Sequence, residues 1–373
     1  ATNATLQASC SYAASYSPRG ALSLALTFIE EEASRWLSCA DSGASKGYQR
    51  PFRCSWRRDP PRSARVGTIA SALGAMAKVV TILSQKGGTG KTTTVRTLAD
   101  CYRRSGARVL CVDLDPQGNL SDYFDVPPDA QPTVGEVLTG QAKARDAVHG
   151  DVLPANLGLA EAEIVLSGKM GRELMLRRAL KDLRRSYDLV LVDCPPSLGL
   201  LTVNALVAAD YALVTSAAEY FSLQGVEQAL EVVELARDNL NEELAWVGVV
   251  LNMADMRLVH AREALAQLRE SFGGKVFDAI IRRSVRYAES AERGISILEY
   301  APDLGVDYVD LAVELARRID FEAPVRRLRA LRRELAEGSG AAGDPSTNEG
   351  AAASADSGHA ASSKRTAPAR TKR

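Results

Sequence analysis

The stretch that decides the fold is Lys86-Gly87-Gly88-Thr89-Gly90-Lys91-Thr92-Thr93. It follows an apolar run at residues 79–84 and opens an amphipathic run at 92–104. Its glycines let the backbone turn tightly and aim N–H groups at phosphate oxygens, and the start of the following helix favours the same negative charge. In this setting Lys91 would contact the β- and γ-phosphates of a nucleotide, and the Thr92 hydroxyl would ligate Mg²⁺. The sequence therefore predicts a phosphate-binding loop between a strand and a helix.

The loop departs from the ordinary pattern, in which a glycine precedes the glycine–lysine pair by five positions. Gln85 stands at that first glycine position, and an additional lysine, Lys86, follows it. Cradling of phosphate does not require this second cation. It either stabilises charge in its own site or reaches into the site of a partner subunit.

Two further segments complete the expected nucleotide site. Residues 113–119 read Asp-Leu-Asp-Pro-Gln-Gly-Asn and follow a strong strand pattern, and strand alternation would place Asp113 and Asp115 on the same side. Residues 189–193 are four apolar residues and Asp193, the arrangement that places a carboxylate beside Mg²⁺ and its waters. Thr92 and Asp193 are thus the predicted metal ligands.

Strand-like and helix-like patterns alternate through the middle of the chain. Strands are expected at 79–84, 108–114, 189–192, 212–215 and 246–251, and helices at 92–104, 173–185, 225–240 and 259–272. Buried strands separated by helices of this length indicate an α/β fold of the P-loop NTPase type. It would have a doubly wound, mostly parallel sheet with helices on both faces. Ligands bind beyond the carboxyl ends of the strands in such sheets, which is where these motifs fall.

Composition sets the limits of the folded region and excludes several classes of protein. We expect residues 1–75 to be a disordered or mis-assigned extension before Met76, 76–336 to be the ATPase domain, and 337–373 to be a disordered tail with a basic end. No apolar run approaches the length of a membrane span. Six scattered cysteines and three histidines indicate neither a zinc site nor a disulfide framework. Residues 76–336 hold 32 Lys and Arg against 37 Asp and Glu, so any binding to a polyanion must use a local patch.

The segments 86–93, 113–119 and 189–199 closely resemble the ParA/Soj family of chromosome- and plasmid-partitioning ATPases. This family belongs to the deviant Walker A class of P-loop proteins, which also contains MinD. The similarity extends over roughly residues 76–320, and the stretches 113–119 and 281–291 favour ParA/Soj over MinD.

The resemblance implies a role for each matching residue. Lys86 resembles the family's extra lysine, which crosses an ATP-sandwich dimer to contact the partner's nucleotide. Lys91 matches the loop lysine, Asp115 the carboxylate that positions the attacking water, and Asn252 the position that contacts the adenine base. The implied catalytic residues are Lys86, Lys91 and Asp115. The implied nucleotide contacts are Lys86, Gly87, Gly88, Thr89, Gly90, Lys91, Thr92, Thr93 and Asn252.

The resemblance also implies partners. Such a chain would be a slow ATPase that uses ATP and Mg²⁺, dimerises on ATP binding, binds DNA without sequence preference and releases it when a ParB-type protein triggers hydrolysis. It would be cytoplasmic and nucleoid-associated. Arg282, Arg283 and Arg286 are the candidate DNA contacts, unless they pair with Glu289, Glu292 and Asp278 instead.

Three alternatives remain open from the residues. A MinD-like positioning ATPase would bind membranes through an amphipathic helix at 321–335, although a packing helix or an arm on DNA suits that segment better. An ATP-switched scaffold that positions another cellular machine would differ only in its partner. A metabolic P-loop enzyme is the third, and its nitrogenase-reductase variant would need cluster-ligating cysteines that this chain does not place suitably.

Overall fold

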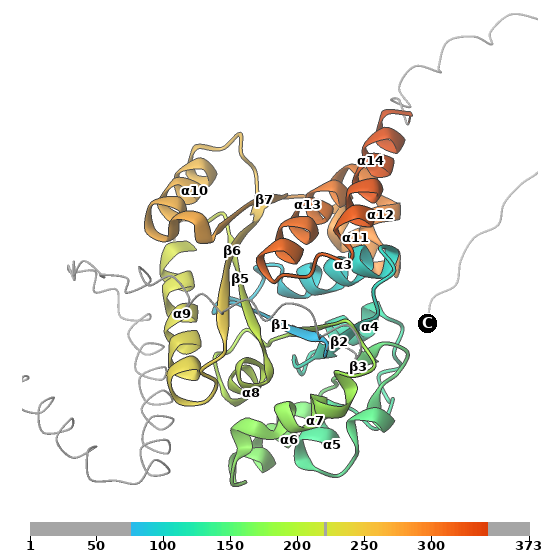
Figure 1. The fold of residues 1–373 in the computed structure, drawn as a ribbon, viewed down its shortest axis with the longest axis vertical. Coiled ribbons are helices and arrows are strands. Elements are labelled where there is room, and N and C mark those ends of the chain that lie inside the picture. The colour runs from blue at the N-terminus through green and yellow to red at the C-terminus, as the bar shows by residue number, and fades with distance from the viewer. Residues whose placement is uncertain (1–75, 220–221, 342–373) are drawn as a thin grey trace, which may run out of the picture.

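The computed structural model of the chain describes residues 76–219 and 222–341 (Figure 1). The expectations for residues 1–75 and for the basic end of the C-terminal tail lie outside the described residues. The strands are β1 (Lys78–Leu83), β2 (Val109–Asp113), β3 (Val152–Leu153), β4 (Leu189–Asp193), β5 (Tyr211–Ala217), β6 (Ala245–Ala254) and β7 (Val276–Arg282). The α-helices are α3 (Lys91–Arg104), α4 (Asn119–Tyr123), α5 (Val134–Thr139), α6 (Gly158–Ser167), α7 (Met175–Leu183), α8 (Leu200–Ala208), α9 (Ser222–Asn239), α10 (Val259–Phe272), α11 (Arg286–Glu292), α12 (Ile297–Tyr300), α13 (Pro302–Arg318) and α14 (Val325–Ala341).

The strands form one parallel sheet in the order β3-β2-β4-β1-β5-β6-β7. The chain runs from β1 outward to β2 and β3, returns through β4, and continues beyond β1 on its other side with β5. Because parallel strands carry their carboxyl ends at the same edge, the segments after β1, β2 and β4 meet there. The predicted doubly wound α/β fold is confirmed.

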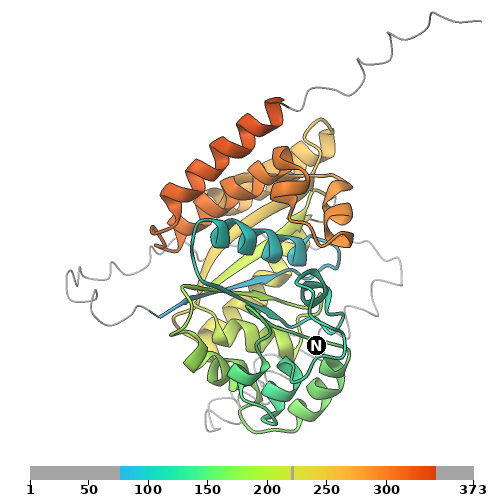
Figure 2. The same ribbon diagram turned by 90° about the vertical axis from the view of Figure 1, so that its right-hand side faces the viewer.

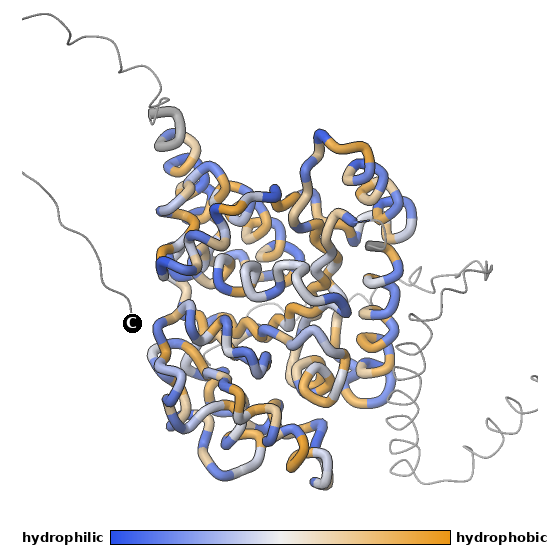
Figure 3. Tube along the Cα trace, turned by 180° about the vertical axis from the view of Figure 1, so that it is seen from behind, coloured by the Kyte–Doolittle hydropathy of each residue, from blue (hydrophilic) through white to orange (hydrophobic). Residues whose placement is uncertain are grey.

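Burial on both faces explains why these segments form strands. Every residue of β2 and β4 is buried, and β1 is exposed only in part at its first residue. Runs of Val, Leu and Ile suit such a position, because their side chains pack on both sides of a pleated sheet. The tube in Figure 3 shows this as hydrophobic stretches along the strands, whereas the helices alternate between hydrophobic and hydrophilic residues.

Two layers of helices cover the sheet (Figure 2). Helices α3, α4 and α11 to α14 contribute to the hydrophobic core on one face, and α5 to α10 to the core on the other. Helix α14 extends to Ala341, so it continues beyond the expected start of the tail at residue 337. Its apolar side chains Val325, Leu328 and Leu335 are buried against the core that α3 and α13 share. The apolar face expected at 321–335 therefore belongs to a packing helix.

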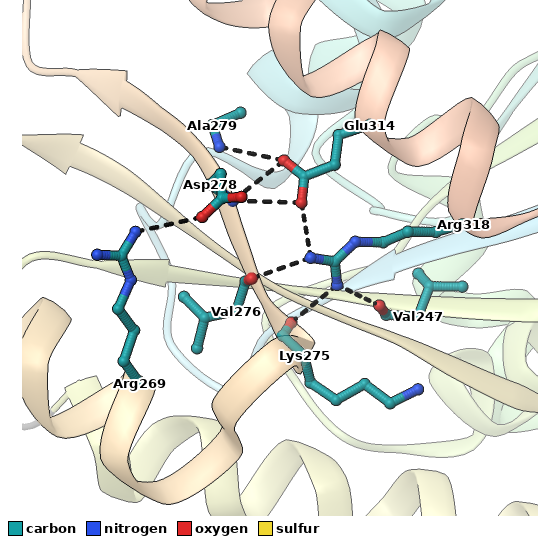
Figure 4. Close-up of polar contacts among 8 residues, drawn as sticks. All are labelled: Val247, Arg269, Lys275, Val276, Asp278, Ala279, Glu314 and Arg318. Atoms are coloured by element: carbon teal, nitrogen blue, oxygen red, sulfur yellow. Dashed lines mark hydrogen bonds and ion pairs between the residues drawn. The ribbon is translucent and has the colours of Figure 1, made fainter. Parts of the chain in front are cut away.

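The edge of the sheet is held by a largely buried ion pair on α13 (Figure 4). The Arg318 guanidinium donates to the carbonyls of Val247, Lys275 and Val276 and to Glu314 Oε1 at 2.6 Å. Glu314 in turn accepts hydrogen bonds from N–H groups at the start of β7. The β6–β7 register shifts twice, so the pair satisfies backbone groups at an irregular edge.

Candidate nucleotide-binding and hydrolytic site

The loop between β1 and α3 has the backbone that its glycines predict. Gly88 and Gly90 adopt left-handed conformations, with φ of 73° and 81°. At Gly90 a Cβ atom would also lie 3.0 Å from the side-chain nitrogen of Asn252. Only glycine meets both demands at this position without strain.

A set of hydroxyl groups braces the loop from inside. The Ser84 hydroxyl lies 2.8 Å from that of Thr89, which lies 3.1 Å from the hydroxyl of Thr215 on β5. Thr89 is buried, so its side chain supports the loop from within and its backbone remains the part that can face a ligand. Ser84 and Thr215 were not predicted as site residues, because nothing in the sequence shows that β5 lies beside the loop.

Lys91 lies at the start of α3 with its ammonium turned back over the loop. Its Nζ donates to the carbonyl of Lys86 at 3.3 Å, and the residue is 6% exposed. Burial lowers the pKa of Lys91, and the nearby acids Asp193 and Asp115 oppose that effect. The sheet thus brings these three predicted residues together from three different segments.

The end of β4 provides the predicted metal-binding acid. Asp193 is fully buried, and its Oδ2 accepts a hydrogen bond from the Thr92 hydroxyl at 2.6 Å. Its other oxygen, Oδ1, is buried without a hydrogen-bond partner among the described residues. Burial, together with repulsion from Asp113, raises the pKa of Asp193 well above its ordinary value. A carboxylate oxygen with unused lone pairs beside a hydroxyl fits the oxygen ligands that Mg²⁺ takes.

Asp113 and Asp115 have different environments at the end of β2. Asp113 pairs in register with Asp193, is fully buried, and accepts hydrogen bonds from Ser121 and from the N–H of Asp115 at 3.0 Å. Burial raises its pKa to about 6, although these hydrogen bonds oppose the shift. Asp115 lies beyond the strand, half-buried, where its Oδ1 accepts a hydrogen bond from Gln117 N at 3.0 Å. Asp113 therefore holds the loop, and the carboxylate of Asp115 lies close enough to Lys91 and Asp193 to raise the pKa of both.

Comparisons with known proteins agree with this geometry. The model of the family described as AAA domain matches residues 77–246. Sporulation initiation inhibitor protein Soj from Bacillus subtilis is 40% identical over 250 residues, which cover 65% of this chain and 99% of Soj. The chain belongs to the ParA/Soj family of ATPases. Chromosome partitioning protein ParA from Caulobacter vibrioides is 39% identical over 251 residues, covering 65% of this chain and 93% of that protein.

A solved structure is similar over the same region. Cobyrinic acid a,c-diamide synthase from Mycobacterium smegmatis, with bound ADP and magnesium, superposes with a TM-score of 0.54. It is 38% identical and covers 58% of this chain and 93% of its own. The predicted family and ATPase activity are therefore confirmed.

Within this ParA/Soj ATPase, Lys86 points away from its own loop interior. Its side chain is 62% exposed, and its ammonium pairs with Glu219, which is 59% exposed. Both residues line a small hollow of about 240 Å³ between the loop, the end of β5 and the start of α9. Glu219 follows β5 and Lys86 follows β1, so their contact depends on the pairing of these two strands.

Asn252 lies underneath the loop. It is 1% exposed, and its Nδ2 donates to the Thr89 carbonyl at 2.9 Å and to the Thr94 hydroxyl at 3.1 Å. The side chain therefore supports the loop in this structure. Its contact with an adenine base remains a prediction.

The three arginines expected to contact DNA lie at the end of β7 and the start of α11. Arg282 pairs with Asp307 at 2.8 Å, and Arg286 with Asp303 at 2.8 Å, both acids being on α13. The pairing with Glu289, Glu292 or Asp278 that the sequence left open is wrong for these two arginines, because α13 packs beside β7 and brings its own acids closer. Arg283 is exposed and makes no ion pair among the residues that the structure describes.

In the described part of the chain, no helix is long and apolar enough to cross a membrane.

Proposed function

We propose that this ATPase partitions DNA: an ATP-bound sandwich dimer binds DNA without sequence preference and releases it on hydrolysis, which a ParB-type partner stimulates. The observation that supports the dimer is the position of Lys86. Its ammonium stands at the mouth of the loop, more than half exposed, and its partner Glu219 is equally accessible. A cation in this position is able to exchange its carboxylate for a phosphate group of a second subunit.

ATP with Mg²⁺ is the cofactor set of this ATPase. Bound Mg²⁺ neutralises charge on the β- and γ-phosphates. Thr92 and Asp193 would hold the metal, Thr92 by its hydroxyl and Asp193 by the oxygen that lacks a partner among the described residues. Lys91 would exchange the Lys86 carbonyl for a phosphate oxygen, and backbone N–H groups of residues 87–93 would bind the remaining oxygens. Asp115 would accept a hydrogen bond from the attacking water and orient it.

This arrangement accounts for slow turnover in a single subunit. Phosphoryl transfer depends on positioning and on cations around the γ-phosphate. Within one chain, Lys91 is the cation turned over the loop, whereas Lys86 is held outside by Glu219. Dimerisation would supply the second lysine, and a partner protein would raise the rate further.

DNA contact would begin with Arg283. Arg282 and Arg286 would have to share their charge with α13, which weakens each as a phosphate ligand. Arg283 makes no ion pair among the described residues, although it lies close enough to Asp255 to lower the pKa of that carboxyl, and a dimer would present Arg283 twice. Replacing Arg283 by alanine should weaken DNA binding on every sequence and reduce the slope of log affinity against log salt by about one for each phosphate that is no longer neutralised. Arg177→Ala, an exposed arginine on α7, is the matched control.

The experiment offers the full chain to non-specific duplex DNA and to anionic liposomes, with ATP or ADP, across a salt series. ATP-dependent DNA binding that weakens with salt, together with dimers in light scattering, is the expected result. Binding to liposomes but not to DNA would contradict the proposal and favour a MinD-like ATPase. The structure gives that alternative little support, because the apolar face of α14 is already buried. Binding to neither would leave a scaffold whose partner is a protein.

A further inference from the structure

The segment that carries Asp115 ends in a very short helix, α4. This helix has five residues, Asn119–Tyr123, whereas isolated helices shorter than about 12 residues are marginal in water. The sheet supports it from one side, because Ser121 donates to Asp113 through both its N–H and its hydroxyl. Without a contact at its other end, the segment would be free to pivot about Asp113.

Helix α3 supplies that contact through one row of side chains. Arg96, Asp100 and Arg103 are spaced by four and three residues, so they lie along one face of the helix. Tyr123 donates its hydroxyl to the Asp100 carboxylate at 2.7 Å, and the centre of its ring lies 4.6 Å from the guanidinium carbon of Arg96. The ring of Phe124 lies 4.6 Å from the guanidinium carbon of Arg103. Three side chains of α3 therefore hold the last residue of α4 and the residue after it.

The contacts of Tyr123 are strengthened by partial burial. Arg96 is 4% exposed and also donates to the Tyr287 carbonyl at 2.7 Å, so it cannot leave the Tyr123 ring for water at low cost. Burial, together with the nearby Asp100 carboxylate, raises the pKa of Tyr123, so the hydroxyl keeps the proton that it donates. A hydrogen bond to a charged acceptor is also stronger than one between neutral groups.

The same helix begins with the predicted phosphate-binding lysine. Lys91 opens α3, and the helix continues without a break to Arg104. At about 1.5 Å of rise per residue, Asp100 lies about 14 Å along the axis from Lys91. A continuous helix of this length is a rigid spacer. The position of Asp115 relative to the phosphate loop is thus set from two sides, by β2 through Asp113 and by α3 through Tyr123.

We propose that Arg96, Asp100 and Tyr123 are positioning residues for ATP hydrolysis: by fixing the end of α4 to α3, they hold Asp115 at the distance from the phosphate loop that the reaction needs. They act through Asp115 and do not touch the nucleotide themselves. A displacement of about 1 Å can lower a reaction rate about 100-fold, so a contact outside the site can control turnover. The inference rests on the proposed function, since it requires that Asp115 orients the attacking water.

The test compares two variants that each remove one hydrogen bond from the same oxygen. Oδ2 of Asp100 accepts the Tyr123 hydroxyl and, also at 2.7 Å, the hydroxyl of Ser296. Tyr123→Phe removes the first bond and keeps the ring beside Arg96. Ser296→Ala removes the second bond, which does not reach the segment of Asp115, and is the matched control. Ser296 also caps α12, so this control should lose at least as much stability as Tyr123→Phe.

Turnover is measured on the full chain at saturating ATP, and ATP affinity by calorimetry. Tyr123→Phe should lower kcat about fivefold, the size of one lost hydrogen bond, with ATP affinity unchanged. Tyr123→Leu, which also loses the contact with Arg96, should lower kcat at least about tenfold. Ser296→Ala should keep both quantities. Asp100→Asn keeps an oxygen that accepts the Tyr123 hydroxyl, so its kcat should stay closer to wild type than that of Asp100→Leu.

Hydrogen exchange reads the position of the segment directly. The amides of residues 115–119 should exchange faster in Tyr123→Phe than in wild type, and at the wild-type rate in Ser296→Ala. In an Asp115→Ala background, Tyr123→Phe should change kcat little further, because the group that it positions is gone.

Three results would overturn the inference. These are an equal loss of kcat in Tyr123→Phe and Ser296→Ala, a loss of ATP affinity with kcat unchanged in Tyr123→Phe, and a full additional loss of kcat when Tyr123→Phe is added to Asp115→Ala. The proposed function fails by other results. Full turnover in Asp115→Ala would overturn the role of Asp115 and the inference with it, whereas absence of ATP-dependent DNA binding would contradict the partitioning role alone.

Discussion

Replacing Arg318 by methionine removes the cation at the sheet edge while keeping a long apolar side chain. The guanidinium makes three hydrogen bonds to carbonyls and one to Glu314, and it lies over the Phe277 ring with its central carbon 3.9 Å from the ring centroid. A hydrogen bond to a charged group contributes about 1.5–3 kcal/mol, and a buried acceptor left without a donor costs about 1–3 kcal/mol. The side chain is 20% exposed, so water replaces part of this loss.

We expect Arg318→Met to lower the free energy of unfolding by about 3–5 kcal/mol, the range for removing one partner of a buried pair. At about 2–4 °C for each kcal/mol in a domain of this size, the melting temperature should fall by roughly 10 °C. Urea unfolding followed by circular dichroism gives the free energy, and a thermal scan gives the temperature. Nucleotide should still bind, since the loop lies at a different place in the sheet.

Arg317→Met is the control for this prediction. Arg317 is the preceding residue on α13, is exposed, and makes no side-chain hydrogen bond or ion pair among the described residues. The same change of charge and the same new side chain should therefore alter stability by less than about 0.5 kcal/mol. The reasoning is refuted if the two variants differ by less than about 1 kcal/mol, which is the size of an exposed ion pair.

Four further predictions concern the nucleotide site. Lys91→Ala should lose nucleotide affinity and turnover, and unchanged ATP binding in calorimetry would contradict the loop assignment. Asp115→Ala should bind ATP and dimerise with turnover reduced at least about 100-fold, and monomers in light scattering at saturating ATP would argue against this. Gly90→Ala should be destabilised by about 1–2 kcal/mol in urea unfolding, because a left-handed residue gains a Cβ atom. The Asp113 pKa of about 6 exceeds the ordinary 3.8, so the folded chain holds a proton that the unfolded chain releases between these values. Stability should therefore fall as pH rises through this window, and Asp113→Asn should flatten the fall in unfolding titrations between about pH 4.5 and 6.5.

The elements that the sequence predicted well are those whose hydrophobic pattern lies within one continuous segment. The helix expected at 259–272 is α10, Val259–Phe272, and the strand expected at 189–192 is β4, which ends one residue later at Asp193. The phosphate loop could be predicted for the same reason, because its residues are consecutive and can be recognised without reference to distant segments. Strand β7 was missed, because it is an edge strand whose positions 278 and 282 are exposed and interrupt the apolar run.

The contacts that the sequence could not predict join segments far apart in the chain. Glu219 meets Lys86 only because β5 pairs with β1, and Asn252 reaches the loop only because β6 follows β5 in the sheet. The acids that pair with Arg282 and Arg286 come from α13, a helix with no motif of its own. The sequence of this one segment shows the arginines but not the acids of α13 that pair with two of them. A prediction from that segment alone therefore overestimated the positive charge that is available to bind DNA.

The nucleotide loop and the arginine face are linked through one buried cation. Arg96 lies on α3, one and a half turns beyond the start of the helix, and is 4% exposed. It donates to the Tyr287 carbonyl of α11 at 2.7 Å, and its guanidinium lies 4.6 Å from the centre of the Tyr123 ring, at the end of α4. A buried charge cannot give up such partners without a large cost, so Arg96 holds α3, α4 and α11 together. Because α3 begins at the phosphate loop, α4 follows Asp115 and α11 begins at Arg286, this one side chain joins the nucleotide site to the segment that carries the arginines.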